Sequence, residues 1–335
     1  MKIVFMGTPE FSLNVLESLI ENCNVIAVVT QPDKEVGRKH TLTMSPVKEL
    51  ALKHNIKVLQ PKKLKNEYQD IIDLNPDVII TCAYGQILPY ELLSYPKYKT
   101  INVHASLLPK LRGGAPIQRA IMEGYKKTGV TIMRTEAGMD DGDMISSYEI
   151  EIKDDDTYET LSSKLSVIGK DLLIKTLPSI FDGTCKYIKQ NEDEVTFAKI
   201  IKKEDEYLNF NDTTINIYNK IRGLSPEPCC YFNLDNERVK VYNAKIGNSK
   251  ASSYGKIINI SKEGLGISTI DGEIIITKLQ FPGKKVMEFK DYLNGIKKED
   301  LINKKINYLC RYYQITKHMN QQFLKEIEKG SKSAL

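Results

Sequence analysis

The sequence predicts an α/β protein in which a doubly wound, mostly parallel sheet is followed by a small β-barrel. In the first half, short runs of Val and Ile alternate with amphipathic stretches. Near-continuous apolar runs are typical of parallel strands that are buried on both faces. After about residue 206 the pattern changes to short apolar runs at close spacing, as in a small barrel. A length of 335 residues fits two such domains.

The first domain is expected over residues 1–200. It starts with an apolar strand and a helix in which Phe11, Val15, Leu16 and Leu19 recur at helical spacing. Strands and helices then continue to alternate along this half of the chain. We expect strands at 2–7, 25–31, 56–60, 76–85, 100–104 and 128–135, and helices at 9–21, 46–54, 64–74, 115–124 and 157–181.

The second domain is expected over residues 206–298, with a C-terminal extension over 299–335. One helix at 213–222 precedes the barrel, and the helical stretch FKDYLNGIK follows it. The barrel strands are expected at 229–234, 238–247, 254–260, 264–270 and 273–280.

The connection QPDKEVGRKHTLTMSP, residues 31–46, is long for a link between a strand and a helix. It holds few apolar residues and four basic ones, counting His40. Connections of this length without regular structure are usually functional or disordered. We therefore expect a loop of one of these two kinds here.

The net charge of +5 is unevenly distributed along the chain. Residues 201–335 contain 23 Lys and Arg against 16 Asp and Glu, a balance of +7, so the remainder carries −2. A basic second half beside a slightly acidic first half indicates a polyanionic partner that docks mainly on the second domain. A Lys-rich, well-solvated surface would give the same composition, so this alternative stays open.

Several function classes are disfavoured. The apolar runs are too short for a membrane span, and the chain enters a strand directly rather than through a signal peptide, so we expect a cytoplasmic protein. The six cysteines and four histidines show no metal-ligand spacing, so no metal is expected. Gly7 follows the first strand without the GxGxxG pattern of dinucleotide-binding folds, which disfavours a nicotinamide cofactor.

Asn102 and His104 are the strongest candidates for catalysis. Alternate residues of a strand share a face, so both side chains point the same way at the carboxyl end of a buried parallel strand, where open α/β sheets bind ligands. An amide NH2 can hold a carbonyl oxygen as charge develops on it, and an imidazole can move a proton near neutral pH. Together they suit acyl transfer to a nucleophile that the substrate supplies. Two polar side chains that only cap a strand end are the alternative.

The turn GMDDGDM, residues 138–144, carries three acids and follows a predicted strand. A carboxylate here can orient His104 or help to take up a proton released by an attacking amine. The chemistry of Asp140, Asp141 and Asp143 does not rank them. The turn lacks the later Glu of an EF-hand loop, which disfavours calcium.

Six segments resemble the methionyl-tRNA formyltransferase family, which is folate-dependent, and they occur in the family's order from residue 1 to about 298. They read MGTPEF, TQPD with GRKHTLTMSPVK, AYGQILP, INVHASLLPKLRGGAPI, GMDDGDM and IRGLSPEPCCYF. Six such matches in sequence are highly specific. The resemblance implies a Rossmann-like formyltransferase domain followed by an OB-like domain whose basic face contacts tRNA.

The resemblance also implies an activity and its reacting groups. The activity is formyl transfer from 10-formyltetrahydrofolate to the α-amino group of methionine on initiator methionyl-tRNA. By position, Asn102 holds the formyl oxygen, and His104 acts in proton transfer and stabilises the tetrahedral intermediate. Asp140 matches the third catalytic residue. We expect a monomer.

Binding residues follow from the same resemblance. The basic residue that reaches the acceptor stem of the tRNA corresponds to Arg38, with Lys39 beside it. The folate-binding segment SLLP, whose backbone groups and apolar side chains receive the pterin, corresponds to four residues: Ser106, Leu107, Leu108 and Pro109.

The chain departs from the family at three places. Glu227 lies between two prolines where the family carries a Trp, and Leu111 replaces a Trp before Arg-Gly. We interpret both as packing substitutions, because neither touches the proposed chemistry. The tail after about 299 extends past the usual end of the family, and it either adds tRNA contacts or forms an appended helix, which we favour.

Two other functions remain open. Formyltransferases that act on amino-sugar nucleotides share the Asn-x-His, SLLP and acidic-turn pattern, so the catalytic residues do not separate the two substrates. The basic loop and the basic second domain favour tRNA. An RNA-binding protein with a degenerate formyltransferase domain is the other alternative, although Asn102, His104 and Asp140 are all present.

Overall fold

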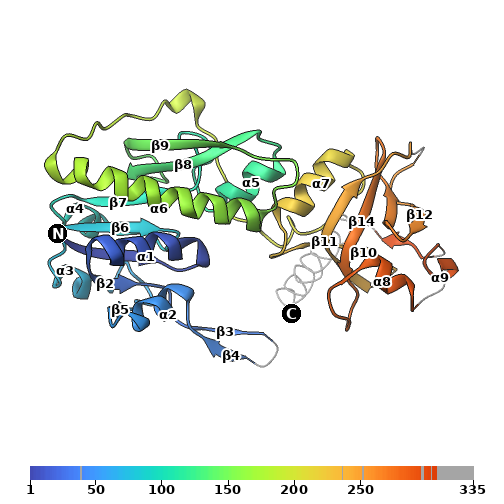
Figure 1. Cartoon of the computed structure of the whole chain (residues 1–335), viewed down its shortest axis with the longest axis horizontal. Helices are drawn as coiled ribbons and strands as arrows, with labels where there is room; N and C mark the ends of the chain where they lie inside the picture. The colour runs from blue at the N-terminus through green and yellow to red at the C-terminus, as the bar shows by residue number, and fades with distance from the viewer. Residues whose placement is uncertain (38–39, 236, 251–252, 296–297, 303, 308–335) are drawn as a thin grey trace, which may run out of the picture. The chain divides into compact units, whose positions relative to one another are not determined.

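The computed structural model describes residues 1–37, 40–235, 237–250, 253–295, 298–302 and 304–307 (Figure 1). The chain divides into two compact units. The first consists of Met1–Glu206 with Asn219–Cys229, and the second of Tyr207–Tyr218 with the described residues from Cys230 onward. Each unit is built around its own sheet.

The first unit contains a seven-stranded sheet of order β5-β2-β1-β6-β7-β8-β9. Neighbours from β5 to β7 are parallel, whereas β8 and β9 extend the sheet antiparallel. The predicted doubly wound, mostly parallel sheet is confirmed, and β9 has no counterpart among the predicted strands. The strands are β1 (Lys2–Gly7), β2 (Asn24–Val29), β5 (Lys57–Leu59), β6 (Val78–Cys82), β7 (Thr100–His104), β8 (Lys127–Arg134) and β9 (Met144–Glu151).

Strand β1 shows why the parallel strands are apolar without alternation. Ile3 and Phe5 belong to the core on one face of the sheet, and Val4 and Met6 to the core on the other. Helices α1, α2, α5 and α6 cover the first face, and α3 and α4 the second. Their bounds are α1 (Leu13–Asn22), α2 (Pro46–Lys53), α3 (Gln69–Ile72), α4 (Tyr90–Ser94), α5 (Pro116–Met122) and α6 (Tyr158–Asp182), and short 3-10 turns lie at Glu10–Ser12 and Glu192–Glu194.

Two helices of the first unit differ from the predictions. The helix predicted at 64–74 is reduced to α3, because the amides of Asn66 and Glu67 close tight turns onto the carbonyls of Lys63 and Leu64 instead of starting a helix. Leu64 is fully buried in this turn, and its amide donates to the side chain of Gln86 at 2.8 Å. Helix α4 was not predicted.

The connection 31–46 is not an irregular loop, which corrects the expectation from its length. Strands β3 (Lys34–Val36) and β4 (Thr41–Thr43) pair antiparallel and form a hairpin. Gly37 lies in the turn with φ +73°, a conformation that glycine adopts at no steric cost. Arg38 and Lys39, the two residues assigned to tRNA contact, lie outside the described residues.

The second unit is built around an antiparallel sheet of order β12-β13-β14-β11-β10-β16, with β15 paired to β14. All five predicted strands are present. The elements after residue 206 are α7 (Thr214–Gly223), β10 (Cys230–Leu234), β11 (Glu237–Ile246), β12 (Ile257–Ser261), β13 (Gly264–Ser268), β14 (Glu273–Gln280), β15 (Met287–Glu288), α8 (Phe289–Leu293), α9 (Lys298–Ile302) and β16 (Ile306–Asn307).

The start of the C-terminal extension is part of this sheet, because β16 pairs with β10 through Ile306 and Leu234. The side chain of Leu301 in α9 is almost fully buried. Residues 308–335 lie outside the described residues, so an appended helix there stays a prediction.

Candidate functional site

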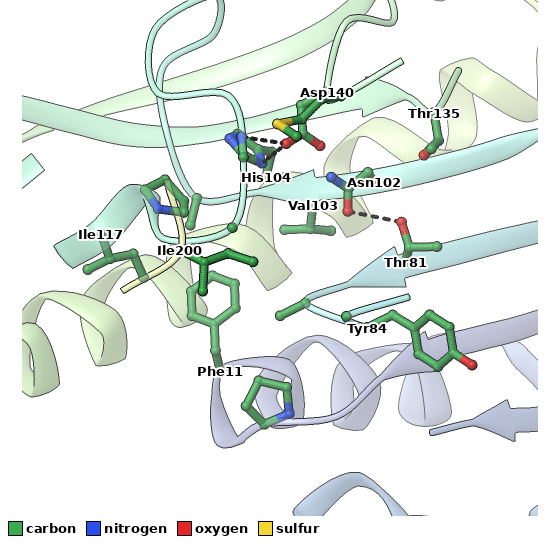
Figure 2. Close-up of a pocket in the computed structure, with 18 of the residues that line it drawn as sticks. Phe11, Thr81, Tyr84, Asn102, Val103, His104, Ile117, Thr135, Asp140 and Ile200 are labelled. Atoms are coloured by element: carbon green, nitrogen blue, oxygen red, sulfur yellow. Dashed lines mark hydrogen bonds and ion pairs between the residues drawn. The ribbon is translucent and has the colours of Figure 1, made fainter. Parts of the chain in front are cut away.

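A cavity of about 550 Å³ opens at the carboxyl ends of β6 and β7, where open α/β sheets bind ligands (Figure 2). Asn102, His104 and Asp140 all line it, so the structure brings the three predicted catalytic residues together. All the residues that line the cavity belong to the first unit.

Asn102 is placed by the pairing of two parallel strands. It lies on β7 directly opposite Thr81 of β6, so the two side chains share one face of the sheet. The hydroxyl of Thr81 donates to the amide oxygen of Asn102 at 2.9 Å. The amide nitrogen has no partner among the described residues and is turned toward the His104 side of the cavity (Figure 2). It is therefore available as a hydrogen-bond donor to a bound carbonyl.

His104 ends β7 and is only 5% exposed. Its Nε2 lies 3.0 Å from the carbonyl oxygen of Leu111. A carbonyl only accepts, so Nε2 carries a proton and donates it to this bond. Nδ1 lies 3.6 Å from Oδ2 of Asp140. Because Nε2 is committed to the backbone, Nδ1 is the ring nitrogen that can gain or lose a proton toward the cavity.

Asp140, which the family resemblance singled out, is the acid of the turn 138–144 that lines the cavity. Asp141 is exposed, and neither it nor Asp143 lines the cavity. Oδ2 of Asp140 accepts a hydrogen bond from the amide of Gly113 at 2.8 Å. Its backbone has φ +48°, and residues held in this sparsely populated region often occur at functional sites.

Gln190 holds the backbone of this turn from another part of the chain. Its amide nitrogen donates to the carbonyl oxygens of Asp140 and Gly142, both at 2.8 Å. Its amide oxygen accepts from Nε of Arg112 at 2.9 Å, and Arg112 is in turn paired with Glu192 at 2.8 Å. The hydrogen bond from Arg112 lowers the pKa of Glu192.

Gly113 allows the loop after β7 to pass close to its neighbours. Its φ is +119°, and a Cβ at this position would lie 2.8 Å from the carbonyl oxygen of Ala198. The loop is fixed by backbone bonds in both directions between Arg112 and the segment 196–198. The amide of Gly113 therefore points at Asp140 as part of a rigid frame.

Ser106, Leu107, Leu108 and Pro109 are not among the residues that line this cavity, so their assignment to folate binding stays a prediction. Ser106 is fully buried, and its hydroxyl donates to the carbonyl oxygen of Lys110 at 2.6 Å. The hydroxyl of Thr131 donates to the Ser106 carbonyl at 2.7 Å and accepts from the Leu108 amide at 3.2 Å. These bonds turn the segment toward β8 instead of the cavity.

Two apolar walls flank the polar centre (Figure 2). Phe11, Ile117 and Ile200 form one, and the other includes Tyr84, whereas Ile87 also lines the cavity. Burial raises the pKa of the Tyr84 phenol, whose hydroxyl has no partner among the described residues. The sequence predicted no functional role for these residues, although Phe11, Tyr84 and Ile87 fall within the segments that resemble the family.

Thr81, Arg112 and Gln190 were also missed. Thr81 had a usable signal, because it is a hydroxyl residue near the end of an apolar strand that neighbours the strand of Asn102. No local sequence signal pointed to Gln190, because 50 residues separate it from the Asp140 that it contacts.

Burial raises the pKa of the Cys82 thiol to about 12, so this neighbour of the cavity is not a thiolate nucleophile near neutral pH. The described residues contain no group of three His, Cys, Asp or Glu side chains that could hold a metal ion. Within the same part of the chain, no helix is long and apolar enough to cross a membrane.

An α/β sheet that presents an amide donor, a buried imidazole and a carboxylate around one cavity suits a group transferase whose substrate brings its own nucleophile. Two family models match the chain: "Formyl transferase" over residues 1–177 and "Formyl transferase, C-terminal domain" over residues 200–297. The chain belongs to the formyl transferase family.

Curated relatives narrow this assignment. The chain is 46% identical to methionyl-tRNA formyltransferase of Staphylococcus aureus (strain MW2), over 91% of this chain and 99% of the relative. It is 49% identical to methionyl-tRNA formyltransferase of Bacillus thuringiensis subsp. konkukian, over 89% of this chain and 96% of the relative. Among solved structures, the sugar 3N-formyltransferase WlaRD, with dTDP and 5-N-formyl-THF, is 22% identical with a TM-score of 0.62 and covers 85% of this chain and 99% of its own. This last likeness concerns the fold alone.

Proposed function

We propose that this chain is a methionyl-tRNA formyltransferase that uses 10-formyltetrahydrofolate as the formyl donor and initiator methionyl-tRNA as the acceptor. The observation that carries the proposal is the convergence of Asn102, His104 and Asp140 on one cavity, in a chain that is 46–49% identical to relatives with this activity. The product is formylmethionyl-tRNA, which serves the initiation of protein synthesis.

The reaction forms a C–N bond between the formyl carbon and the methionyl α-amine, and breaks the bond from that carbon to N10 of the folate. The free amide nitrogen of Asn102 donates a hydrogen bond to the formyl oxygen, and this bond strengthens as the tetrahedral intermediate gains negative charge. The amine must attack in its neutral form and then lose a proton.

His104, assisted by Asp140, takes up that proton. Nδ1 of His104 faces Oδ2 of Asp140 at 3.6 Å, so a proton taken from the attacking amine is stabilised between an imidazole and a carboxylate. The departing N10 must gain one proton to leave as a secondary amine. Return of the proton from His104 to N10 balances the reaction and restores the site.

The two apolar walls of the cavity are the proposed surfaces for the folate and for the methionyl end of the tRNA. Ser106 to Pro109 keep a role in folate binding only indirectly, because they hold the loop that follows β7. We assign tRNA contact to Arg38 and Lys39, which follow β3 in the sequence, and to the basic domain at 206–298. Residues 1–200 form the catalytic domain. We further propose a cytoplasmic monomer.

A single assay tests the assignment. The protein is incubated with 10-formyltetrahydrofolate and either charged initiator tRNA or a 4-amino sugar nucleotide, and the formylated products are measured. We expect formylmethionyl-tRNA and no formylated sugar. Transfer to the sugar alone would overturn the proposal, and tRNA binding without any transfer would favour a binding protein on a formyltransferase scaffold.

A further inference from the structure

Thr81 interrupts the apolar strand β6 at the point where the strand meets the reaction centre. It is 5% exposed, and it lies opposite Asn102 in the register of β6 and β7. Directly opposed residues on one face of a sheet are close enough for their side chains to interact. The only oxygen that Thr81 brings to this face is therefore placed beside the amide of Asn102.

The hydroxyl of Thr81 has one proton and two acceptors within reach. Its Oγ1 lies 2.9 Å from Oδ1 of Asn102 and 3.4 Å from the carbonyl oxygen of Ile101. The shorter bond uses the proton to hold the amide oxygen of Asn102. Both N–H groups of the amide then remain for the cavity, where they point toward the His104 side (Figure 2).

The alternative arrangement reverses the amide. Nδ2 of Asn102 would then donate to Thr81, Thr81 would donate to Ile101, and Oδ1 would face the cavity. An oxygen at that position repels a carbonyl oxygen that gains negative charge, whereas an N–H stabilises it. The direction of one hydroxyl proton thus decides whether Asn102 helps or opposes the reaction.

We infer that Thr81 is a positioning residue for Asn102, and that its hydroxyl selects the amide orientation that donates to the transferred formyl oxygen. The inference rests on the proposed function, since it needs a carbonyl that becomes an oxyanion. Thr81 touches no substrate in this scheme. It acts only through Asn102.

The test compares Thr81→Val with Thr81→Ser. Valine keeps the shape of threonine and removes the hydroxyl, whereas serine keeps the hydroxyl. We expect Thr81→Val to lower kcat for formyl transfer about tenfold, the order of one hydrogen bond. The KM values for the formyl donor and for methionyl-tRNA should stay near those of the unmodified chain, and Thr81→Ser should restore most of kcat.

Thr100→Val is the matched control. Thr100 lies on β7, two residues before Asn102, and is fully buried, and its hydroxyl has no partner among the described residues. Its replacement removes a buried threonine hydroxyl from the same sheet without touching the amide. We expect its kcat to stay within about twofold of the unmodified chain.

A double-mutant cycle with Asn102→Ala separates positioning from a general effect on folding. If Thr81 acts only through Asn102, Thr81→Val adds no further loss in the Asn102→Ala background. An equal loss in both backgrounds, or an unchanged kcat in Thr81→Val beside an active unmodified chain, would overturn the inference. Should Thr81→Val fail to fold, Thr81→Ala also removes the hydroxyl, and its kcat is compared with that of Thr81→Ser instead. Failure of the unmodified chain to formylate methionyl-tRNA would instead overturn the proposed function.

Discussion

The reaction centre and the β3–β4 hairpin are held in opposite ways. Around the buried His104 and the partly buried Asp140, hydrogen bonds hold the groups in place: Leu111 holds His104, and Gly113 and Gln190 hold Asp140. The hairpin is exposed, with Leu42 at 67%, and its side-chain link between His40 and Glu35 lies at the surface. The difference teaches that the proposed chemistry rests on atoms held in fixed positions, whereas the hairpin to which we assign tRNA contact presents exposed side chains.

The hairpin nevertheless starts from a fixed base. Nζ of Lys48 lies 2.7 Å from Oδ2 of Asp33, and Gln60 donates to Oδ1 of Asp33 at 2.7 Å and to the Gln31 carbonyl at 2.9 Å. The hydrogen bonds from Lys48 and Gln60 lower the pKa of Asp33. The start of the segment 31–46 is thus anchored to α2 and to the residue after β5.

The largest effect is expected at the reaction centre. His104→Ala removes the group that moves the proton, so formyl transfer should fall by a factor of about 10³. Affinity for methionyl-tRNA should be nearly intact, because His104 is buried and takes no part in phosphate contacts. Initial rates and filter binding of charged tRNA measure the two quantities. An equal loss of formyl transfer and of tRNA affinity would show that the reaction centre also contributes to tRNA binding.

Gly113→Ala and Gly37→Ala sharpen the comparison, because both replace a glycine of positive φ. At Gly113 the new Cβ meets the Ala198 carbonyl at 2.8 Å and disturbs the amide that holds Asp140, so we expect kcat to fall about 10²-fold. At Gly37 nothing lies within 4 Å of the new Cβ. That variant should keep kcat and change only the KM for tRNA. Equal kcat values for the two variants would contradict the idea that the rigid loop around Gly113 holds Asp140 in place.

A smaller effect is expected from Arg38→Ala. Loss of one phosphate contact should weaken transfer to tRNA about tenfold and lower the salt dependence of tRNA binding by about one unit of slope. Folate binding, measured by fluorescence titration, should hardly change. Equal losses of tRNA and folate binding would remove the hairpin from its assigned role.

The smallest effect concerns stability against acid, away from both regions. Burial raises the pKa of Asp156, but bonds from Lys164, the Lys153 amide and Thr160 outweigh it, and the net pKa is lowered. A lowered folded-state pKa gives stability that is present above the unfolded value of about 3.9 and is lost as pH falls through the folded value. Thermal unfolding of Asp156→Asn between pH 7 and pH 3 should therefore show a flatter pH dependence than the unmodified chain. An unchanged pH dependence of thermal unfolding would show that Asp156 does not contribute to stability in this pH range.

The local sequence was sufficient to predict the bounds of those strands and helices whose hydrophobic residues follow a clear pattern. The apolar run of β1 and the helix α6 lie within a residue or two of their predicted bounds, because burial on two faces and helical spacing are written in neighbouring residues. The hairpin was missed because its strands are only three residues each and mostly polar. Short exposed strands leave no hydrophobic period to detect.

The sequence by itself determined the class of reaction and one half of the site. Asn102 and His104 share a face because a strand repeats every two residues, and this holds before any tertiary contact forms. The family resemblance had already singled out Asp140, but only the tertiary structure placed it at the cavity beside His104, left Ser106 to Pro109 outside the cavity lining, and brought Thr81 and Gln190 to the residues they hold. The physical reason is distance along the chain. A side-chain hydrogen bond acts over about 3 Å in space, so partners 20 to 50 residues apart are defined only when the sheet and its loops assemble.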